Sequence, residues 1–437
     1  MFPKNGEDFT ELRFPGFTDS WEQRKLGDVM NIITDYVAAG SFADIAKNVQ
    51  YDSNPSYAQL VRTVDIKKKF CNNGFVYIDK KAFEYLWRVN LDEECIILPN
   101  IGANIGEVYY LSPVDLPYKN NVLGPNAILL KTTENTKLIY TLFQTEYFQN
   151  KLSLIVASSG QPKFNKTELK QIDLVLPNIE EQECIGEFFS NFDNLITLHQ
   201  RKLNHLQDKK KGLLQKMFPK NGEAFPELRF PGFTDPWKQR KYSDTFTNIA
   251  NNTLSRAELN YNSGLAKNVH YGDVLIKFGE LLDVEKDEIP YITDAALVNK
   301  FRSSKLQNGD VIIADAAEDE TVGKCTELAN VGEEIVVSGL HTIPCRPTLS
   351  FASGYLGYFM NSSAYHTQLL RLMQGTKVSS ISKSALRDTV IFHPFDIVEQ
   401  KKISELFQQL NNLITLHQRK LNHLQEQKKA LLQQMFI

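Results

Sequence analysis

One segment of the sequence occurs twice. Residues 194–217 read NLITLHQRKLNHLQDKKKGLLQKM, and residues 412–435 read NLITLHQRKLNHLQEQKKALLQQM. The copies differ at four positions (208/426, 209/427, 212/430 and 216/434), so 20 of the 24 residues are the same. Because such a repeat means that one structural unit is built twice, it constrains the fold more than any other feature of the chain.

Each copy belongs to a longer helical pattern. Asn178 and Asp396 are suitable N-caps, and Glu181 and Glu399, three residues later, are placed to reach back to the cap. Apolar residues then recur at alternating spacings of four and three residues, which is the pattern of a coiled-coil seam. The predicted seam consists of Ile185, Phe189, Phe192, Ile196, Leu203, Leu206 and Leu213 in the first copy and Ile403, Phe407, Leu410, Ile414, Leu421, Leu424 and Leu431 in the second.

The two predicted stripes have equal length and matched chemistry. The simplest partner for one stripe is therefore the other, in an antiparallel pair of helices that are each about 58 Å long at 1.5 Å per residue. Two unrelated surface helices, each packed on its own domain, remain the alternative interpretation.

A second repeat opens the two halves of the chain. Residues 1–25 return as residues 217–241 with differences at 8/224, 10/226, 20/236 and 22/238, so 21 of 25 residues are the same. Each copy contains a Phe-Pro-Gly-Phe turn followed by a tryptophan, Trp21 or Trp237, which we expect to dock this arm by packing. The chain thus consists of two sequence halves, each made of an arm, a body and a long helix.

The two bodies differ in sequence but resemble each other in layout. Both contain Ala-Lys-Asn-Val, short β-rich runs, a helix-like stretch and a last strand that leads into the long helix (46–49, 136–156 and 172–176 in one; 266–269, 355–373 and 389–392 in the other). We predict the α+β class: two mixed α+β domains separated by two long antiparallel coiled-coil helices, with pseudo-twofold symmetry. The predicted segments are 1–177 (arm and first domain), 178–217 (first helix), 218–395 (repeated arm and second domain) and 396–437 (second helix).

The composition is that of an ordinary globular chain, with 42% hydrophobic residues, 23% charged residues and a net charge of −3. No apolar run approaches the ~20 residues of a membrane span, and the first residues lack the apolar core of a signal peptide. Five scattered cysteines without a CxxC pair favour a reducing cytoplasm over a disulfide framework or a zinc site. We therefore expect a cytoplasmic protein without a bound metal, in which DNA binding needs local basic patches or charge from a partner.

Catalytic motifs are incomplete. Residues 54–57 (NPSY) resemble the tetrapeptide of adenine methyltransferases, but the third residue is Ser and no glycine-rich cofactor loop accompanies it. A carboxylate–lysine set at Asp396 and Lys401 lacks a counterpart in the first half, where Glu183 stands in place of the lysine. These patterns favour turn, loop and N-cap interpretations.

Several loops combine Lys or Arg with Ser, Asn, Gln and an aromatic residue, the mixture that phosphate contact and base-edge reading require. The clearest pair lies around Lys163 and Lys377, because both loops directly precede the last strand of their body. For any single loop, an ordinary solvated loop is the alternative. The candidate DNA-binding residues are Lys67, Lys69, Asn104, Lys119, Asn121, Gln161, Lys163, Lys166, Lys267, His270, Arg302, Lys305, Lys377, Ser379 and Lys383.

The architecture resembles the specificity subunit of type I restriction–modification enzymes. Residues 176–182 (LPNIEEQ) match the family's motif at the start of its long helix, and the helix ends at 210–214 and 428–432 also fit. The second copy of the motif, residues 393–400 (HPFDIVEQ), keeps Glu-Gln but has His-Pro in place of Leu-Pro. The resemblance spans the chain.

The resemblance implies a subunit without catalytic activity. Each body would be a target-recognition domain that reads one half of a bipartite DNA sequence, asymmetric because the bodies differ, and the helices would set the spacer. The implied partners are double-stranded DNA, two copies of a methyltransferase subunit docked on the repeats, and restriction subunits, with no membrane. S-adenosylmethionine, ATP and Mg would be bound by those partners and none of them by this chain.

Two other functions stay open from the residues alone. The chain could be a scaffold or adaptor that joins two proteins through a coiled coil without DNA contact. It could also be a methyltransferase, which the missing cofactor loop disfavours. Co-purification with a methyltransferase, and adenine methylation at a split site, would separate the three functions.

Overall fold

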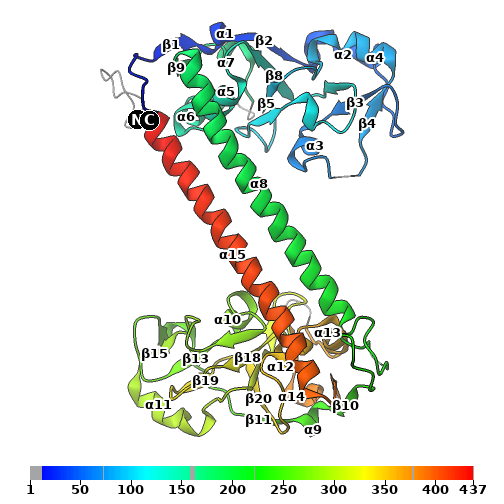
Figure 1. The fold of residues 1–437 in the computed structure, drawn as a ribbon, viewed down its shortest axis with the longest axis vertical. Helices are drawn as coiled ribbons and strands as arrows, with labels where there is room; N and C mark the ends of the chain where they lie inside the picture. The colour runs from blue at the N-terminus through cyan, green and yellow to red at the C-terminus, as the bar shows by residue number, and fades with distance from the viewer. Residues whose placement is uncertain (1–11, 72, 158–162, 221, 376–377, 437) are drawn as a thin grey trace. The chain divides into compact units, whose positions relative to one another are not determined.

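The two halves of the chain build closely related series of elements. The computed structural model describes residues 12–71, 73–157, 163–220, 222–375 and 378–436. The chain divides into unit 1, residues 1–200 and 419–437, and unit 2, residues 201–418. Figure 1 shows the two long helices, α8 (Ile179–Lys216) and α15 (Ile397–Phe436), each of which contributes residues to both units.

Unit 1 contains two small sheets and a two-stranded ladder. The larger sheet has the antiparallel order β2-β8-β5-β6, the second has the order β4-β3-β7 with β3 and β7 parallel, and β1 pairs with β9. The strands are β1 (Glu22–Lys25), β2 (Met30–Asp35), β3 (Ala58–Val61), β4 (Val76–Ile78), β5 (Cys95–Pro99), β6 (Tyr109–Leu111), β7 (Asn121–Leu123), β8 (Ala127–Thr132) and β9 (Asp173–Leu176). The shorter helices are α1 (Leu26–Val29), η1 (Tyr36–Ala39), α2 (Phe42–Asn48), α3 (Thr63–Lys67), α4 (Lys80–Tyr85), η2 (Trp87–Val89), η3 (Pro113–Asp115), α5 (Thr136–Phe143), α6 (Glu146–Ala157) and α7 (Lys166–Leu169).

Unit 2 repeats this topology with one more edge strand in each sheet, β14 and β12, and one more ladder. Its sheets have the orders β11-β20-β16-β18-β14 and β12-β15-β13-β19, and two ladders join β10 to β22 and β17 to β21. The strands are β10 (Lys238–Lys241), β11 (Phe246–Asn248), β12 (Leu259–Asn260), β13 (Lys267–Val269), β14 (Leu281–Asp283), β15 (Tyr291–Ile292), β16 (Val311–Ala314), β17 (Ala316–Ala317), β18 (Cys325–Ala329), β19 (Val336–Ser338), β20 (Thr342–Pro347), β21 (Ser379–Ser380) and β22 (Val390–His393). The shorter helices are α9 (Tyr242–Thr245), η4 (Arg256–Glu258), α10 (Tyr271–Ile276), α11 (Ala295–Phe301), η5 (Arg302–Ser304), α12 (Tyr355–Met360), α13 (Ser363–Leu370) and α14 (Lys383–Leu386).

The parallel pair identifies corresponding strands in the two units. β3 and β7 of unit 1 are parallel, as are β13 and β19 of unit 2. In the larger sheets the central strands β8 and β5 correspond to β20 and β16. Of these central strands, β5, β8 and β16 are almost wholly buried and rich in Ile, Leu and Val, as expected where both faces of a sheet are covered.

The long helices pack against each other in antiparallel orientation within each unit. In unit 1, the ring of Phe189 in α8 lies against that of Phe436 at the end of α15, and Asp193 of α8 contacts Lys428, earlier in α15. In unit 2, Phe218, just beyond α8, stacks on Phe407 of α15 with ring centroids 6.1 Å apart. Every predicted seam residue is buried or half-buried. The mixed α+β class with antiparallel helices is confirmed, and the alternative of two unrelated surface helices is wrong.

A buried ion pair ties each arm to the start of a long helix. The two oxygens of the Glu181 carboxylate accept hydrogen bonds from the guanidinium of Arg13 (both 2.7 Å), and Arg229 holds Glu399 in the same way (2.7 and 2.8 Å). Asn178 caps α8 by accepting the N–H of Glu181 (3.0 Å). The expectation that the two glutamates reach back to their caps is therefore wrong, because a bidentate pair with arginine occupies them instead.

Two features of the predicted layout need correction. In the first copy of Ala-Lys-Asn-Val, residues 46–48 end helix α2, whereas residues 267–269 of the second copy form strand β13, so the two segments do not correspond. Each predicted helix-like stretch divides into two helices, α5 and α6 in unit 1 and α12 and α13 in unit 2. Among the described residues, no helix is both long enough and apolar enough to cross a membrane.

Candidate nucleic-acid interface

A junction at the end of β5 brings together three separate segments of unit 1. The N–H of Asn100 donates to the carbonyl of Asn126 (3.2 Å), at the start of β8, and the carbonyl of Asn100 accepts the N–H of Phe164 (3.3 Å). The chain then continues as a loop over residues 101–107. We call this place the unit 1 junction, and several of the predicted DNA-binding residues lie around it.

Two predicted residues meet at the far end of this loop. The ammonium of Lys67, at the end of α3, donates to the side chain of Asn104 (3.1 Å) and to the carboxylate of Glu107 (2.5 Å). Burial alone would raise the pKa of Glu107, but the hydrogen bonds from Lys67 and Tyr109 hold it below its ordinary value. Half of the Lys67 side chain stays exposed, so its ammonium is accessible to a phosphate oxygen.

Two further predicted lysines flank the near end of the loop. Lys163 forms a β-bridge with Ile101. Lys166 is the first residue of α7 and donates to the carboxylate of Asp35 at the end of β2 (2.8 Å). Both side chains line a hollow of about 350 Å³ together with Asn100. Cations and an amide group therefore share one surface at the unit 1 junction.

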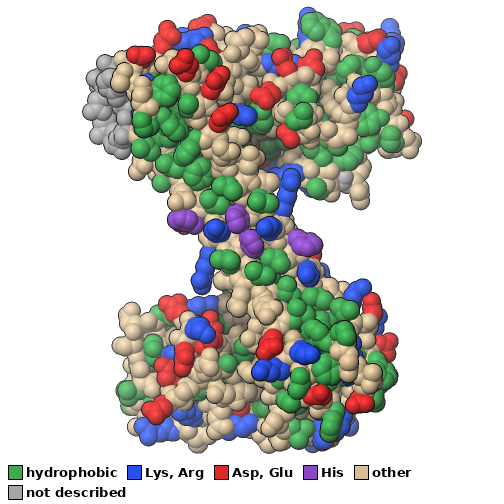
Figure 2. Space-filling model, in the orientation of Figure 1, with side chains coloured by type: hydrophobic (Ala, Val, Ile, Leu, Met, Phe, Trp, Pro, Cys, Tyr) green, Lys and Arg blue, Asp and Glu red, His purple; other side chains and the backbone are tan. Residues whose placement is uncertain are grey.

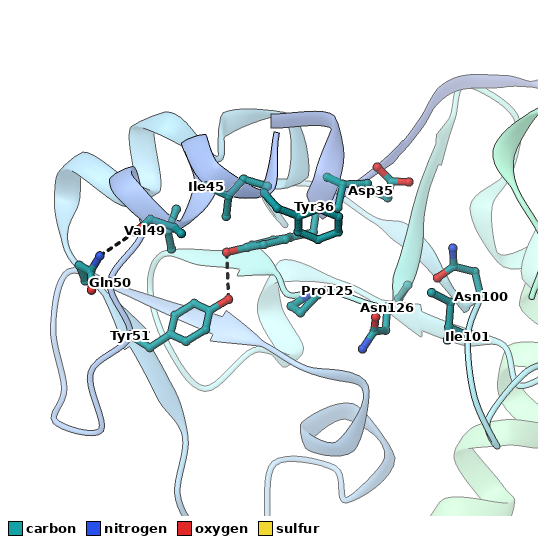
Figure 3. Close-up of a pocket in the computed structure, with 14 residues that line it drawn as sticks. Asp35, Tyr36, Ile45, Val49, Gln50, Tyr51, Asn100, Ile101, Pro125 and Asn126 are labelled. Atoms are coloured by element: carbon teal, nitrogen blue, oxygen red, sulfur yellow. Dashed lines mark hydrogen bonds between the residues drawn. The ribbon is translucent and has the colours of Figure 1, made fainter. Parts of the chain in front are cut away.

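A larger hollow of about 750 Å³ is also lined by Asn100 (Figure 3). One wall contains Tyr36 and Tyr51, whose hydroxyl oxygens lie 3.0 Å apart, and the other contains the amides of Asn100 and Asn126. The side-chain oxygen of Asn100 is buried and meets no hydrogen-bond donor in the part of the chain that the structure describes. An unpaired buried acceptor is unfavourable, so this group is suited to accept a donor from a ligand.

The same junction recurs in unit 2 with different side chains. Asp315 follows β16, and its N–H donates to the carbonyl of His341 (3.1 Å), at the start of β20. The ring Nδ1 of His341 lies 3.3 Å from the Asp315 carboxylate. Burial raises the pKa of Asp315, although the charges of His341 and Lys383 oppose the shift. Lys383 is the first residue of α14, as Lys166 is of α7, and Ser379 pairs with β17 directly beyond Asp315. We call this place the unit 2 junction.

Other predicted residues lie inside unit 2. Lys267 belongs to β13, where its ammonium contacts Glu334 (2.5 Å) and donates to the carbonyl of Val284 (2.8 Å). His270 is buried and accepts the N–H of Gly272 as the N-cap of α10. The expectation that residues 267–271 form a loop is therefore wrong, because they belong to β13 and the start of α10.

The remaining predicted residues are dispersed. Asn121 is buried in β7, and its side chain donates to the carbonyl of Tyr118 (2.6 Å). Lys69 donates to Thr197 of α8 (3.2 Å), and Lys305 donates to the carbonyl of Glu333 (3.1 Å). Lys119 and Arg302 are exposed, and Gln161 and Lys377 lie outside the described residues.

The surface charge is mixed. On the face shown in Figure 2, Lys and Arg side chains are interspersed with Asp and Glu over each unit. Among the described residues, no group of three or more His, Cys, Asp or Glu side chains is placed to hold a metal ion. A face of mixed charge supplies little sequence-independent attraction to DNA.

The repeated helices expose the same apolar residues. Leu195 and Leu198, in unit 1, are 45% and 48% exposed, and Leu413 and Leu416, at the same positions of the repeat in unit 2, are 44% and 55% exposed. None of them belongs to the predicted seam. Exposed apolar side chains that recur in two copies are typical of surfaces that bind a partner.

Asn126 and His341 are absent from the predicted set. Both residues have positive φ angles, +69° and +54°, which the structure reveals and the composition of a loop does not. The only local signal in the sequence is the Gly-Pro pair before Asn126, which indicates a turn.

Comparisons with known proteins agree with this arrangement. Residues 18–208 match the family model described as the Type I restriction modification DNA specificity domain. The chain is 22% identical, over 98% of its own length and 94% of the relative, to the Type I restriction enzyme MjaVIII specificity subunit of Methanocaldococcus jannaschii. Its fold is similar to the crystal structure of a type I restriction–modification system S subunit from M. genitalium, with a TM-score of 0.54 and 11% identity over 98% of this chain and 99% of that one.

Proposed function

The chain belongs to the family of type I restriction–modification specificity subunits, with its DNA specificity domain at residues 18–208, and we propose that its two units each read one half of a bipartite, asymmetric DNA sequence. One observation carries this proposal: the two units share a topology but present different side chains at the same junction. Asn100 and Asn126 in unit 1 correspond to Asp315 and His341 in unit 2. Two domains that share a topology but differ in the side chains at their junctions are suited to read two different half-sites.

Different side chains contact phosphates and read bases. Lys67 and Lys166 at the unit 1 junction, and Lys383 at the unit 2 junction, contact phosphates and position the duplex. The amide and imidazole groups beside them read base edges. Because the chain has a net charge of −3, the assembled enzyme supplies much of the positive charge that DNA binding needs at physiological salt.

The long helices have two roles in the proposal. Their length sets the number of unread base pairs between the half-sites. The exposed leucines of each repeat dock one methyltransferase subunit, and since the two surfaces carry the same residues, two copies of one partner bind. Restriction subunits complete the assembly. S-adenosylmethionine, ATP and Mg are bound by those partners, and this chain carries out no chemical step.

Exchanging one body tests the reading of half-sites. A chain whose residues 26–176 come from a relative is co-expressed with its methyltransferase subunit, and the methylated adenines are sequenced. We expect a site that changes in one half and stays the same in the other, with the unaltered chain as control. A change in both halves would contradict independent reading. If the unaltered chain supports no methylation at a split site, the adaptor function without DNA contact is favoured.

Charged substitutions on the repeats test the docking surface. Leu198→Glu and Leu416→Glu are each expected to release one of the two methyltransferase subunits, which light scattering of the purified complex measures as a loss of mass. Leu154→Glu is the matched control, because Leu154 is also exposed (71%) but lies on α6. Complexes that keep both subunits in both helix variants would exclude this surface.

A further inference from the structure

Five described residues other than glycine have positive φ angles: Lys69, Phe70, Asn126, Asn330 and His341. Two of them occupy corresponding positions. Asn126 directly precedes β8 and its carbonyl accepts the N–H of Asn100, while His341 directly precedes β20 and its carbonyl accepts the N–H of Asp315 (3.2 and 3.1 Å). The same backbone geometry therefore occurs twice, once in each unit, with a different side chain at its tip.

Glycine is the default residue in the left-handed region, and asparagine and histidine are among the few residues with a side chain that tolerate it. A residue that keeps its side chain there in both units is a candidate for a functional role. Neither side chain is needed for the backbone contact, since both contacts are made by the main-chain carbonyls. The side chains themselves are therefore available for another purpose.

The surroundings of Asn126 suit the edge of a base. Its side chain is exposed at the wall of the larger hollow, beside Asn100 and the half-exposed Ile101 (Figure 3). An asparagine amide can bond both N6 and N7 of adenine in the major groove, and an apolar neighbour can contact the methyl group of the paired thymine. Asn126 and Ile101 together present both groups.

The surroundings of His341 suit the edge of a different base. Its side chain is 51% exposed, and its Nδ1 faces the Asp315 carboxylate at 3.3 Å while the ring of Tyr271 packs edge-on against it. A carboxylate at Nδ1 favours the tautomer with the proton on that nitrogen, which leaves Nε2 as an acceptor. An acceptor at this position can bond the exocyclic amine of cytosine or adenine.

We propose that Asn126 and His341 are the corresponding base-reading residues of the two half-sites, and that Asn126 specifies an A·T pair. This inference rests on the proposed function, since it names the residues through which each unit reads its DNA. It adds that one base-pair position in each half is read from the same place in the fold. The difference between the two side chains then makes the half-sites differ at that position.

Glycine substitution tests the proposal without straining the backbone. In the assembled methyltransferase, Asn126→Gly is expected to relax discrimination at one base pair of one half-site by about 5- to 150-fold, the range for one good amide–base contact. The measurement is the methylation rate on DNA duplexes in which each position of the half-site is varied in turn. His341→Gly is expected to relax one position in the other half-site.

Asn330→Gly is the matched control. Asn330 also has a positive φ of +53°, but its side chain donates to Asp283 (2.9 Å) within unit 2, so its loss should leave the recognised sequence unchanged. If Asn126→Gly leaves discrimination unchanged at every position, or relaxes both halves equally, the proposal is overturned. If the body exchange still alters one half in that case, the proposed function stands and only this inference is lost.

Discussion

Lys210 and Lys428 occupy the same position in the two copies of the repeated helix, yet their carboxylate partners come from different places. In unit 1, Lys428 donates to Asp193 of the other long helix (2.6 Å) and to Gln144 of the body (2.7 Å). In unit 2, Lys210 donates to Glu280 of the body (2.6 Å). The corresponding helix residue, Asn411, donates to the second oxygen of the same carboxylate (3.1 Å).

Each lysine–carboxylate pair thus has one amide beside it, which accepts from the lysine in unit 1 and donates to the carboxylate in unit 2, and the acid and the amide exchange places between helix and body. The physical requirement is the same in both units: a poorly exposed ammonium needs a carboxylate nearby. Burial alone would raise the pKa of Glu280, but Lys210 and Asn411 hold it below its ordinary value. The difference shows that each body is matched to its own helix segment, even where the helices are nearly identical in sequence.

The largest expected effect follows from removing one acid. Glu280→Gln leaves Lys210 without a carboxylate and is expected to lower the free energy of unfolding of unit 2 by about 3 kcal/mol. Adding Asn411→Asp gives unit 2 the arrangement of unit 1 and should restore most of that loss. Hydrogen exchange measured by mass spectrometry follows the two units separately, so unit 1 is the internal control. A double variant that is no more stable than Glu280→Gln would break the correspondence.

This matching also explains what could be predicted from the sequence. The period of the apolar residues in 178–217 is set by helix geometry, so the antiparallel pair could be predicted without coordinates. The partners of Lys210 and Lys428 could not, because each acid is chosen by tertiary packing across distant segments. Arg13 is a similar case, since its position in a repeated arm carries no sign that it holds Glu181.

The two copies of Ala-Lys-Asn-Val show most clearly what cannot be predicted from the local sequence. The same four residues end a helix in unit 1 and form a buried strand in unit 2, where Lys267 contacts Glu334. Local propensity is identical in the two copies, so the difference comes from the surrounding sheet. At the candidate site, the lysines beside the junctions could be predicted from loop composition. Asn126 and His341 could not, because a left-handed backbone carries no compositional signal.

A smaller expected effect is a difference between the two units in how their stability depends on pH. Burial raises the pKa of Glu327, in β18, to about 7. The N–H groups of Gly354 and Gly357, at the start of α12, donate hydrogen bonds to its carboxylate and oppose this rise. The corresponding position in unit 1 is Tyr110, which does not titrate in this range. Since the folded state holds this proton more tightly than the unfolded chain, the stability that Glu327 contributes is fully present below pH 4.5 and is lost as the pH rises to about 7.

We therefore expect the free energy of unfolding of unit 2 to fall between pH 4.5 and 7 by about 1–3 kcal/mol in excess of the change that remains in Glu327→Gln. The comparison with this variant is needed because burial lowers the pKa of His270 and His393, whose contribution to stability changes with pH in the opposite direction. Denaturant unfolding followed by hydrogen exchange, corrected for the intrinsic pH dependence of exchange, measures both units in one sample. Glu327→Gln should remove the excess slope of unit 2. An equal slope in the variant would assign the effect to other groups.

The smallest expected effect concerns the link between helix and arm, which is covalent in one unit only. In unit 2 the N–H of Leu228 donates to the carbonyl of Lys216 at the end of α8 (2.8 Å). In unit 1 the N–H of Leu12 donates to the carbonyl of Gln434 at the corresponding position of α15 (3.3 Å), without a direct chain connection. Phe436 lies against Trp21 as Phe218 lies against Trp237, with ring centroids 5.8 and 6.2 Å apart.

Because the same contacts form with and without the link, moving the link should change little. A permuted chain that joins Phe436 to Pro3 and opens between Phe218 and Pro219, with a Met added at its new start, is expected to unfold within about 1 kcal/mol of the original, since closing one loop offsets opening another of similar length. Thermal and denaturant unfolding measure this difference. If unit 2 of the permuted chain lost protection selectively, its arm would depend on the covalent link, and the equivalence of the two arm–helix contacts would fail at that point.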